Sequence, residues 1–501
     1  MPEPRTDSRR NDAERRSRWP TPSSSTVATS RSRSLRRVRL AVVLASALGW
    51  SLAEAPAEAA APDVLRIGDT QLDPAALYFV SFDGLVNNAS YQQSAILTFA
   101  GFQYAAWYTS NRSAVVARRR LPAGAWELAV LPHQLSTNDS HNSISLGISP
   151  ADGRLHVAMD THDTTVFYVK SEAGLVSSPG SRTWSPSRFG AVQRSLDGVA
   201  LGGITYPQFV VTPEQRLQLS YRTGRSGNGT MELAEYNGSW RTLGKWSSAT
   251  GGYTARGATS NTRNLYIHGI TYGPDGRLHA SFTWREDNTA VLCNAGGLAN
   301  HDTGYVFSDD RGRTWRNNAG QQVATTGTGT LVAVGSPGLV VDPLSVDHGL
   351  INQESQVIDS SGIPHVIISY VPGRFTQCVS NYVTQRRSFG RAFHLTRNAQ
   401  GQWTKMEIPV ALNAFGRSQI VLDSEDNVYV VLPFGRIVTA SKASGWTDWT
   451  LRFDGSGLGA FGEVVVDRSR VDSDGVLSIM YQRSSSGTTP SPIRVVDFQI
   501  D

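Results

Sequence analysis

DGRLHASFTW, residues 275–284, is the clearest copy of a pattern that recurs along the chain: a turn with Asp or Gly, then a strand of alternating apolar residues. The other copies are AGFQYAAWY (100–108), DGRLHVAMD (152–160), EQRLQLSYR (214–222), SGIPHVIISY (361–370), EDNVYVVLP (425–433) and DGVLSIMYQ (474–482). Long helical periodicity is absent, and Gly, Ser and Thr interrupt the sequence throughout. Short strands repeated at intervals of tens of residues predict a β-propeller or a solenoid.

Seven copies predict an all-β fold, a seven-bladed β-propeller that forms a single domain. In such a ring the first and last blades must be joined. We expect a strand after residue 61, such as LYFVSF (77–82), to pair with the last strand, IRVVDFQI (493–500).

The first 61 residues differ in composition from the rest of the chain. A basic stretch is followed by the apolar run LAVVLASALGWSLA (40–53) and then by an Ala-rich region typical of cleavage sites. The apolar run has the length of a signal-peptide core and is short for a membrane span. We therefore expect residues 1–61 to be a secretion signal and residues 62–501 to be an extracellular propeller domain. An uncleaved anchor is the alternative.

The net charge belongs to the same segment. Residues 1–61 hold 11 arginines and six acidic residues, a surplus that equals the formal net charge of +5 of the whole chain. The remaining chain is close to neutral, and its basic residues give no sign of a nucleic-acid partner. No later apolar run is long enough for stable membrane insertion.

The chain has two cysteines, Cys293 and Cys378. In an exported protein they could form one disulfide. Two free thiols, and a metal site completed by His301, are the alternatives that the sequence leaves open.

Two consecutive hairpins carry polar residues in the same way. In HNSISLGISPADGRLHVAMDTH the turn signal Pro150-Ala151-Asp152-Gly153 separates two strand-like segments, so we expect His141 and His162 on facing strands, equally far from its tip. In YPQFVVTPEQRLQLSYR, Tyr206 and Arg222 are related in the same way. A proton donor, a proton acceptor and a fixed positive charge at adjacent hairpin ends predict acid/base chemistry on an anion.

The same register brings further polar residues to this level in later units. The candidates for substrate binding are Arg263, His268, Arg285, His301, Asn352 and Arg417, and Asn264, Glu286, Gln353, Arg374 and Arg436 fall at the same level. A ring of guanidinium groups suits a carboxylated or sulfated ligand. The alternative is that these arginines bind backbone carbonyls at the ends of blades. Three histidines at one repeat position, His156, His279 and His365, are expected to pack inside the blades.

These segments resemble the BNR-repeat polysaccharide lyases with seven-bladed propellers, a group that includes ulvan lyases and L-rhamnosyl-α-1,4-D-glucuronate lyases. The resemblance is clearest in HNSISLGI…DGRLHVAMDTHD, ITYPQF…LSYRTG, RNLYIHGITY…FTWRE, NHDTGYVFSDDRGRTW and LINQESQVIDSSGIPHV. SDDRGRTW (308–315) also fits the Asp-box pattern S-x-D-x-G-x-T-W, a structural turn of propeller blades. The resemblance implies a secreted lyase that cleaves the bond between L-rhamnose and O4 of a uronic acid by β-elimination.

The resemblance also implies roles for the four hairpin residues. Arg222 neutralises the uronate carboxylate, which makes the C5 proton acidic enough to be removed. Tyr206 and His141 are the acid/base pair, and Tyr206 alone serving as both is an alternative. His162 orients the substrate or helps to neutralise it. Which residue is the base and which is the acid stays open at this point.

The expected partner is an acidic polysaccharide that contains rhamnose and a uronate, either ulvan or a plant gum side chain, and the protein is expected to be a monomer. The chemistry requires no cofactor, while a structural calcium or zinc ion, as the family implies for some relatives, stays open. The sequence leaves two other functions open. A sialidase-like glycoside hydrolase would need an early Arg-Ile-Pro motif, which the sequence lacks. A carbohydrate-binding propeller without catalysis is the other.

Overall fold

The structure is a computed structural model that describes residues 60–92 and 94–500, which belong to one compact unit, 58–501. The fold is all-β, as predicted. The expected secretion signal lies almost entirely outside the described residues. No helix in the described part of the chain is long and apolar enough to cross a membrane.

The strands of this unit form seven sheets, in which all strand pairings are antiparallel. Sheet 1 holds β2 (Ile96–Phe99), β3 (Phe102–Tyr108), β4 (Ser113–Arg120) and β5 (Glu127–Gln134). Sheet 2 holds β6 (Ser145–Ser149), β7 (Arg154–Met159) and β9 (Phe167–Lys170). Sheet 3 holds β8 (His162–Thr164), β10 (Ile204–Val211), β11 (Leu217–Thr223), β12 (Met231–Tyr236) and β13 (Trp240–Lys245).

Sheet 4 holds β14 (Thr250–Ala255), β15 (Ala258–Tyr272), β16 (Leu278–Glu286), β17 (Asn300–Ser308), β18 (Thr314–Arg316), β19 (Gln322–Thr325) and β20 (Val340–Asp342). Sheet 5 holds β21 (Ser355–Ile358), β22 (Pro364–Tyr370), β23 (Arg391–Arg397) and β24 (Trp403–Ala411). Sheet 6 holds β25 (Gln419–Leu422), β26 (Val428–Leu432), β27 (Arg436–Ala440) and β28 (Thr450–Phe453). Sheet 7 holds β29 (Val465–Asp467), β30 (Val476–Gln482), β31 (Ser491–Ile500) and β1 (Val64–Ala76).

Helices are few and short. The α-helices are α1 (Tyr382–Phe389) and α2 (Arg468–Asp474), and the 3-10 helices are η1 (Ser90–Gln92), η2 (Pro179–Ser181), η3 (Pro186–Arg188), η4 (Thr289–Val291), η5 (Val346–His348) and η6 (Pro433–Gly435). They lie in the connections between strands and add no layer to the fold.

The repeated pattern of the sequence corresponds to one strand in each sheet. The seven repeats form β3, β7, β11, β16, β22, β26 and β30, which belong to seven different sheets. Every residue of β3, β22 and β30 is buried, because adjacent sheets cover both faces of these strands. Burial on both faces explains why these strands read as nearly continuous apolar runs.

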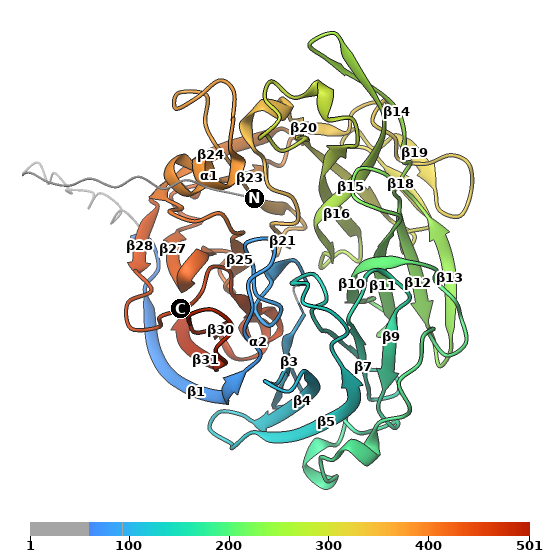
Figure 1. Ribbon diagram of the computed structural model, residues 1–501, viewed down its shortest axis with the longest axis vertical. Coiled ribbons are helices and arrows are strands. Elements are labelled where there is room, and N and C mark those ends of the chain that lie inside the picture. Colours follow the sequence, from blue (N-terminus) through green and yellow to red (C-terminus); the bar gives the residue numbers. More distant parts are fainter. Residues whose placement is uncertain (1–59, 93, 501) are drawn as a thin grey trace, which may run out of the picture. The chain divides into compact units, whose positions relative to one another are not determined.

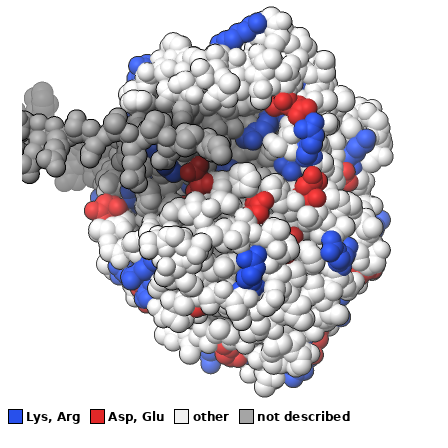
Figure 2. All heavy atoms as spheres, in the orientation of Figure 1, with Lys and Arg blue, Asp and Glu red and all other residues white. Residues whose placement is uncertain are grey.

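The sheets follow one another in sequence order around a common centre (Figure 1). Neighbouring sheets touch through one strand each, here called the first strand of its sheet: β29, β2, β6, β10, β15, β21 and β25, in this order. Figure 2 shows charged groups of both signs scattered over one face, with no patch of a single sign covering it.

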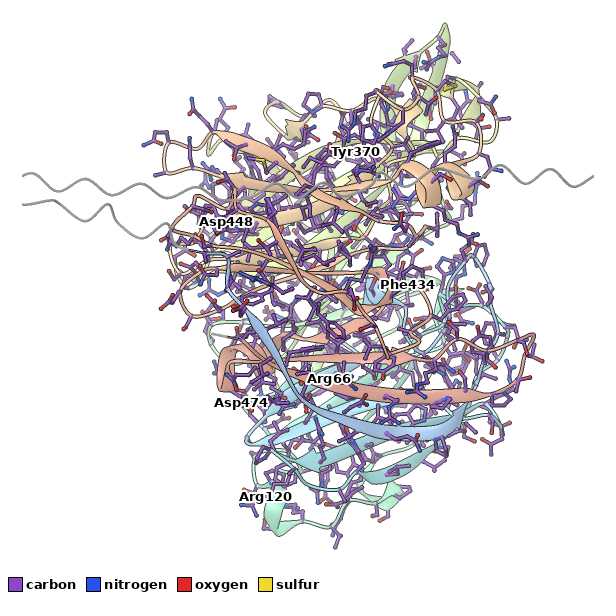
Figure 3. All side chains as sticks on the ribbon, turned by 90° about the vertical axis from the view of Figure 1, so that its left-hand side faces the viewer. Arg66, Arg120, Tyr370, Phe434, Asp448 and Asp474 are labelled. Atoms are coloured by element: carbon purple, nitrogen blue, oxygen red, sulfur yellow. A yellow bond between two sulfur atoms is a disulfide. The ribbon has the colours of Figure 1, made fainter. Side chains whose placement is uncertain are left out.

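The two ends of the unit meet in sheet 7, where β1 pairs with β31 from Val64 opposite Ile500 to Ala76 opposite Ser491 (Figure 3). The prediction that a strand after residue 61 pairs with the last strand is therefore confirmed, but the strand is 64–76, and the example given, 77–82, is wrong. Residues 77–82 leave sheet 7 because the Leu77 amide donates to the Tyr108 carbonyl of sheet 1. This segment then leads to the site described below.

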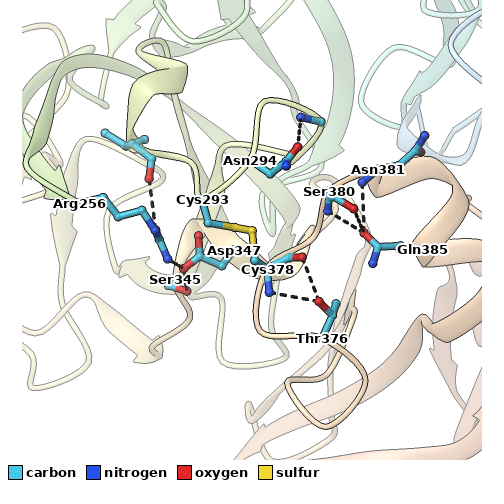
Figure 4. Close-up of a disulfide and its surroundings, with 12 residues drawn as sticks. Arg256, Cys293, Asn294, Ser345, Asp347, Thr376, Cys378, Ser380, Asn381 and Gln385 are labelled. Atoms are coloured by element: carbon cyan, nitrogen blue, oxygen red, sulfur yellow. Dashed lines mark hydrogen bonds and ion pairs between the residues drawn. A yellow bond between two sulfur atoms is a disulfide. The ribbon is translucent and has the colours of Figure 1, made fainter.

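The cysteines form a disulfide, Cys293–Cys378, so the free-thiol and metal alternatives are wrong (Figure 4). The bond links the segment after η4 with the segment before α1 and closes a sequence separation of 85 residues. A nearby ion pair joins Arg256, between β14 and β15, to Asp347 of η5.

Candidate active site

The four residues predicted to be catalytic lie together at the N-terminal ends of the first strands of sheets 2 and 3. The rings of His141 and His162 are stacked with their centroids 4.3 Å apart. The Tyr206 ring lies 5.9 Å from that of His141, and the Arg222 guanidinium lies 5.1 Å from the centre of the Tyr206 ring. An imidazole pair, a phenol and a guanidinium therefore share one small volume.

The histidines reach this position in a way that the hairpin alone does not predict. β6 and β7 pair from Ser145 opposite Ala158 to Ser149 opposite Arg154, so His141 lies beyond the paired strands, in a turn. His162 begins β8, which leaves sheet 2 and pairs with β10 of sheet 3, with His162 opposite Thr205. The predicted arrangement on facing strands of one hairpin is wrong, although the two rings do meet.

Tyr206 is displaced from the regular register of its strand by a bulge. β10 and β11 pair through Thr205 opposite Arg222, and the next pair is Gln208 opposite Ser220. Tyr206 lies in this bulge with a φ of +59°, which is rare for a bulky residue. Bulges of this kind redirect side chains next to functional sites. The bulge turns the phenol toward the histidines.

Asp139 joins the two histidines and was not predicted. Its two carboxylate oxygens lie 2.7 Å from Nδ1 of His141 and 2.6 Å from Nδ1 of His162. An ionised carboxylate only accepts hydrogen bonds, so each Nδ1 carries a hydrogen, and a neutral imidazole in this position carries its lone pair on Nε2. The only signal in the sequence was the position of Asp139 two residues before His141.

The electrostatic surroundings keep the His141 imidazole neutral at neutral pH. Burial lowers the pKa of His141 to about 4, although its hydrogen bond to Asp139 acts in the opposite direction. Burial alone would raise the pKa of Asp139, but the hydrogen bonds from His141 and His162 outweigh it and hold this pKa well below its usual value. His141 is therefore suited to accept a proton through Nε2.

Tyr206 has the opposite protonation behaviour. Burial and the neighbouring Tyr266 raise the pKa of Tyr206 to about 12, despite the nearby guanidinium groups of Arg222, Arg417 and Arg285. Within the described residues, no hydrogen bond engages the Tyr206 hydroxyl. The side chain is thus a neutral phenol at neutral pH whose proton is available to a ligand.

Arg222 is buried and is held by a second tyrosine that the sequence did not reveal. Its guanidinium donates to the Tyr266 hydroxyl at 2.8 Å, to the Thr205 hydroxyl at 3.0 Å and to the Gly224 carbonyl at 3.2 Å. Burial raises the pKa of Tyr266, but Arg222 and Arg285 outweigh burial and bring this pKa below its usual value. Tyr266 thus accepts the hydrogen bond from Arg222, while Tyr206 keeps its proton.

Arg285 provides a more accessible cation beside Tyr266. Its guanidinium lies 5.2 Å from the centre of the Tyr266 ring, and its Nε donates to Asn300 at 2.7 Å. Asn264 pairs with Arg285 across β15 and β16, as the register predicted. The Asn264 amide and Nε of Arg222 are buried with no hydrogen-bond partner among residues 60–92 and 94–500. Unsatisfied buried polar atoms of this kind are expected where a ligand or water completes a site.

Two other predicted residues, Arg417 and Asn352, form the opposite wall together. Arg417 donates to the Asn352 carbonyl oxygen at 2.7 Å and to its side-chain oxygen at 3.0 Å, and it forms an ion pair of 2.8 Å with Glu463. The Arg417 guanidinium lies 5.0 Å from the Tyr91 ring, which is stacked at 5.4 Å on His141. Tyr91 and Glu463 were not predicted, because they come from connections far away in the sequence.

The remaining predicted residues are not brought to Tyr206. Arg263 is buried and forms an ion pair of 2.7 Å with Glu286, which also contacts His301 at 3.0 Å. His268 is fully buried, and its Nδ1 accepts a hydrogen bond from the Glu354 amide at 3.1 Å. Arg263, His268 and His301 thus have contacts inside the fold, and their role in substrate binding remains a prediction.

The arginines at the same predicted level separate in the structure. Arg374 is exposed and pairs with Glu407 at 2.6 Å. Arg436 donates to the carbonyls of Ala411 and Leu412, so it binds the backbone, as the alternative for these arginines predicted.

One group of three side chains in the described part of the chain could hold a metal ion: Asp139, His141 and His162. Their facing Nδ1 and carboxylate atoms already form hydrogen bonds with one another. An ion at this place would therefore replace the contacts that orient the imidazoles.

Comparisons with known proteins agree with this architecture. A family model described as BNR repeat-containing family member matches residues 102–411. The long isoform of an ulvan lyase from Pseudoalteromonas sp. (strain PLSV) is 23% identical over 278 residues, which are 47% of this chain and 27% of that protein. The corresponding protein of Glaciecola sp. (strain KUL10) is 21% identical over 469 residues, 83% of this chain and 43% of that protein. The chain thus spans less than half the length of these curated relatives.

Solved structures resemble the unit over most of its length. The polysaccharide lyase Uly1 superposes with a TM-score of 0.65 at 17% identity, covering 87% of this chain and all of that one. A PL25 ulvan lyase bound to -[GlcA(1-4)Rha3S]- superposes with a TM-score of 0.59 at 12% identity, covering 86% of this chain and 95% of that one. At these identities the superpositions show a shared fold.

Proposed function

The chain belongs to the BNR repeat-containing family, and on that premise we propose that it is a polysaccharide lyase that cleaves at a uronic acid carrying L-rhamnose on O4. The likeness to several ulvan lyases supports the reaction class. The solved lyase bound to a glucuronate–rhamnose unit supports the substrate class. The strongest support is the site itself, because it combines a neutral base, a neutral acid and several cations.

The proposal includes a seven-bladed propeller. Seven sheets in sequence order, first strands in contact and closure by β1 and β31 are the features that support this architecture. In a propeller, connections from different blades converge at one end of the central axis, where a ligand can touch several blades at once. Residues from sheets 2, 3 and 4 meet here in that way.

The cations of the site can stabilise the negative charge that forms in the first step of β-elimination. Removal of the C5 proton leaves negative charge on the uronate carboxylate, and a fixed positive charge nearby stabilises it. We assign this role to Arg222, with its unsatisfied Nε, and to the more accessible Arg285. The Asn264 amide next to Arg285 offers further hydrogen bonds to the same sugar.

The protonation states divide the acid and base roles. His141 has a pKa of about 4 and carries its lone pair on Nε2, so it takes the C5 proton. Tyr206 has a pKa of about 12 and a hydroxyl with no hydrogen bond to another described residue, so it protonates the departing O4 oxygen. His162, fixed by the same Asp139, orients the sugar. Transfers of this kind contribute about 10²–10⁴ each to the rate.

We further propose that the protein is exported and acts outside the cell as a monomer. The composition of residues 1–61 supports export. The disulfide supports an oxidising compartment, where such bonds persist. N-terminal sequencing of protein recovered from the culture medium tests this, and an N-terminus upstream of residue 40 would contradict signal cleavage.

The decisive experiment incubates purified protein with ulvan and, separately, with a rhamnose- and glucuronate-containing plant gum. β-Elimination leaves an unsaturated uronate that absorbs in the near ultraviolet, and we expect this absorbance with at least one polymer. New reducing ends without absorbance would indicate a hydrolase. Binding without either product would indicate a carbohydrate-binding propeller.

Two tyrosine variants make the test specific. Tyr206→Phe removes only the hydroxyl of the acid, and we expect product formation to fall by at least about 10²-fold while polymer binding is retained. Tyr272→Phe is the control, because Tyr272 ends β15 away from the site and its hydroxyl donates to Gln218 at 2.7 Å. Equal losses in both variants would contradict the role of Tyr206.

A further inference from the structure

A tight turn at the edge of the site presents an exposed aromatic ring. Ser81 and Gly84 exchange two backbone hydrogen bonds, of 3.1 and 2.9 Å. Phe82 and Asp83 between them have φ values of +48° and +59°. Two left-handed central residues define a type I′ turn, in which Asn, Asp and Gly are preferred. A phenylalanine in this conformation is unfavourable for folding and therefore needs another explanation.

The exposure of this ring is equally unusual. Phe82 is 65% exposed, whereas Phe375, Phe389 and Phe434, the other exposed phenylalanines in the described part of the chain, are 37–38% exposed. Exposing a large apolar ring to water opposes folding, and isolated aromatic rings at functional sites serve binding. Neither the backbone nor the burial of Phe82 stabilises the fold.

The ring lies directly on the histidine pair. Its centroid is 4.6 Å from that of His141 and 6.2 Å from that of His162, in both cases nearly edge to face. No ring contact joins Phe82 to Tyr206 among the described residues, and none of the cation–ring contacts there involves Phe82. The aromatic platform is therefore on the histidine side of the site, with no ring contact to Arg222 or Arg285.

The turn is held in place from two sides. The Ser140 amide donates to the Ser81 hydroxyl at 2.7 Å, and the Ser140 hydroxyl donates to the Ser81 carbonyl at 2.8 Å. On the other side, Arg387 of α1 donates to Asp83 at 2.8 Å. Ser140 lies between Asp139 and His141, so the position of the ring is coupled to that of the catalytic imidazoles. A preorganised ring loses little freedom when it binds a ligand.

We propose that Phe82 is the stacking platform for the neutral 6-deoxy sugar linked to the uronate, an inference that rests on the proposed function. The charged uronate belongs beside Arg222 and Arg285, where its carboxylate is neutralised. The adjoining sugar carries no carboxylate, and its methyl group and ring C–H bonds provide an apolar face that covers an aromatic ring. Phe82 therefore sets specificity for the sugar next to the cleavage point.

Two substitutions separate the ring from the turn. Phe82→Asn removes the ring but retains a residue that adopts the left-handed conformation readily, and Phe82→Trp retains an aromatic platform. With ulvan as the probe, we expect Phe82→Asn to raise KM about tenfold, as loss of a partly buried aromatic contact predicts, with kcat changed by less than about twofold. Phe82→Trp should have the KM of the wild-type protein. The unfolding midpoint of Phe82→Asn should not fall.

Phe434→Asn is the matched control. Phe434, labelled in Figure 3, also has a left-handed backbone, with a φ of +69°, and is partly exposed. Among the described residues, no ring contact joins it to His141, His162 or Tyr206. Any of three results would overturn the proposal: a KM unchanged in Phe82→Asn, a KM raised in Phe82→Trp as much as in Phe82→Asn, or an equal KM increase in Phe434→Asn.

A binding readout distinguishes this proposal from the proposed function. Electrophoresis through gels that contain ulvan measures retardation without cleavage. We expect the Tyr206→Phe variant to be retarded, and the addition of Phe82→Asn to reduce that retardation. This result would support the platform even if the wild-type protein produced no unsaturated uronate. Absence of retardation in every variant, or equal retardation with and without Phe82, would overturn the platform.

Discussion

Replacing Asp139 with asparagine removes the carboxylate that both catalytic-site histidines share. The two hydrogen bonds are short, 2.7 Å to His141 and 2.6 Å to His162, and each is of the charged type worth about 1.5–3 kcal/mol. Asparagine has one acceptor oxygen and one donor amide, so it can match the Nδ1–H of only one ring. The other ring must turn or carry its hydrogen on Nε2.

The consequence for catalysis follows from the protonation of His141. If its hydrogen moves to Nε2, the nitrogen that should receive the C5 proton is blocked. We expect Asp139→Asn to lower kcat about 10²–10⁴-fold, the range of a lost general base, with KM changed by less than about threefold. Initial rates of absorbance on the cleaved polymer measure both constants. Nitrogen-15 spectra of the imidazoles report the tautomer directly.

Asp359→Asn is the matched control, because Asp359 is a buried carboxylate 3.6 Å from His365 that follows β21 at the end remote from the site. We expect it to alter the unfolding midpoint and leave kcat unchanged. A folded Asp139→Asn protein that retains kcat within about twofold would refute the role of Asp139 in positioning the histidines.

The remaining predictions concern protonation, charge and the covalent link. Because His141 must be neutral and its pKa is about 4, kcat/KM should fall on the acid side only as the pH drops toward 4. On the alkaline side kcat/KM should fall near the Tyr206 pKa of about 12. A rise in rate throughout the alkaline range would instead make a tyrosinate the base. Arg222→Lys replaces the planar guanidinium, whose two terminal nitrogens donate to Tyr266, Thr205 and Gly224, by a single nitrogen, so kcat/KM should fall at least about 10²-fold. A variant affected only in the free energy of unfolding would support a structural role. The double replacement of Cys293 and Cys378 by serine should lower the free energy of unfolding by about 2–4 kcal/mol, measured by urea titration, with kcat unchanged; a loss of activity at unchanged stability would contradict a purely structural bond.

The strands of the fold were predictable because each repeat carries its own turn and its own buried strand. A turn such as Asp275-Gly276 followed by an apolar strand is a local signal, and all seven such strands were found in separate sheets. A closing strand after residue 61 was predicted, but its position was wrong, because pairing between two distant segments of the chain is not local. Both 64–76 and 77–82 contain apolar residues, and they differ in the folded chain because the first pairs with β31 while Leu77 bonds to Tyr108 of sheet 1.

The site was predictable only as far as hairpin register reaches. Counting from a turn placed Tyr206 close to Arg222, because antiparallel strands keep equal distances from their turn. It also predicted that His141 and His162 meet, although they do so from a turn and from a strand of sheet 3 and not from one hairpin. Counting could not reveal the bulge at Tyr206, since one extra residue shifts the register without changing the apolar pattern.

Contacts between sheets were beyond the reach of the sequence pattern. Tyr91, Tyr266 and Glu463 come from three different sheets or connections and meet the predicted residues only in the folded chain. For the same reason the sequence did not reveal that Glu286 binds both Arg263 and His301. Their role in substrate binding remains a prediction.

The two tyrosines around Arg222 explain how one site can hold a strong cation and still keep an acid protonated. A phenol next to a guanidinium usually becomes easier to ionise. Here Arg222 directs its hydrogen bond to Tyr266, whose pKa is lowered, and a negative charge on Tyr266 would in turn raise the pKa of Tyr206. Tyr206 thereby retains the proton that the departing oxygen needs, while the positive charge remains close enough to act on the carboxylate. On this argument Tyr266→Phe should lower the pKa of Tyr206 and move the alkaline limb of kcat/KM to lower pH, and an unmoved limb would separate the two tyrosines.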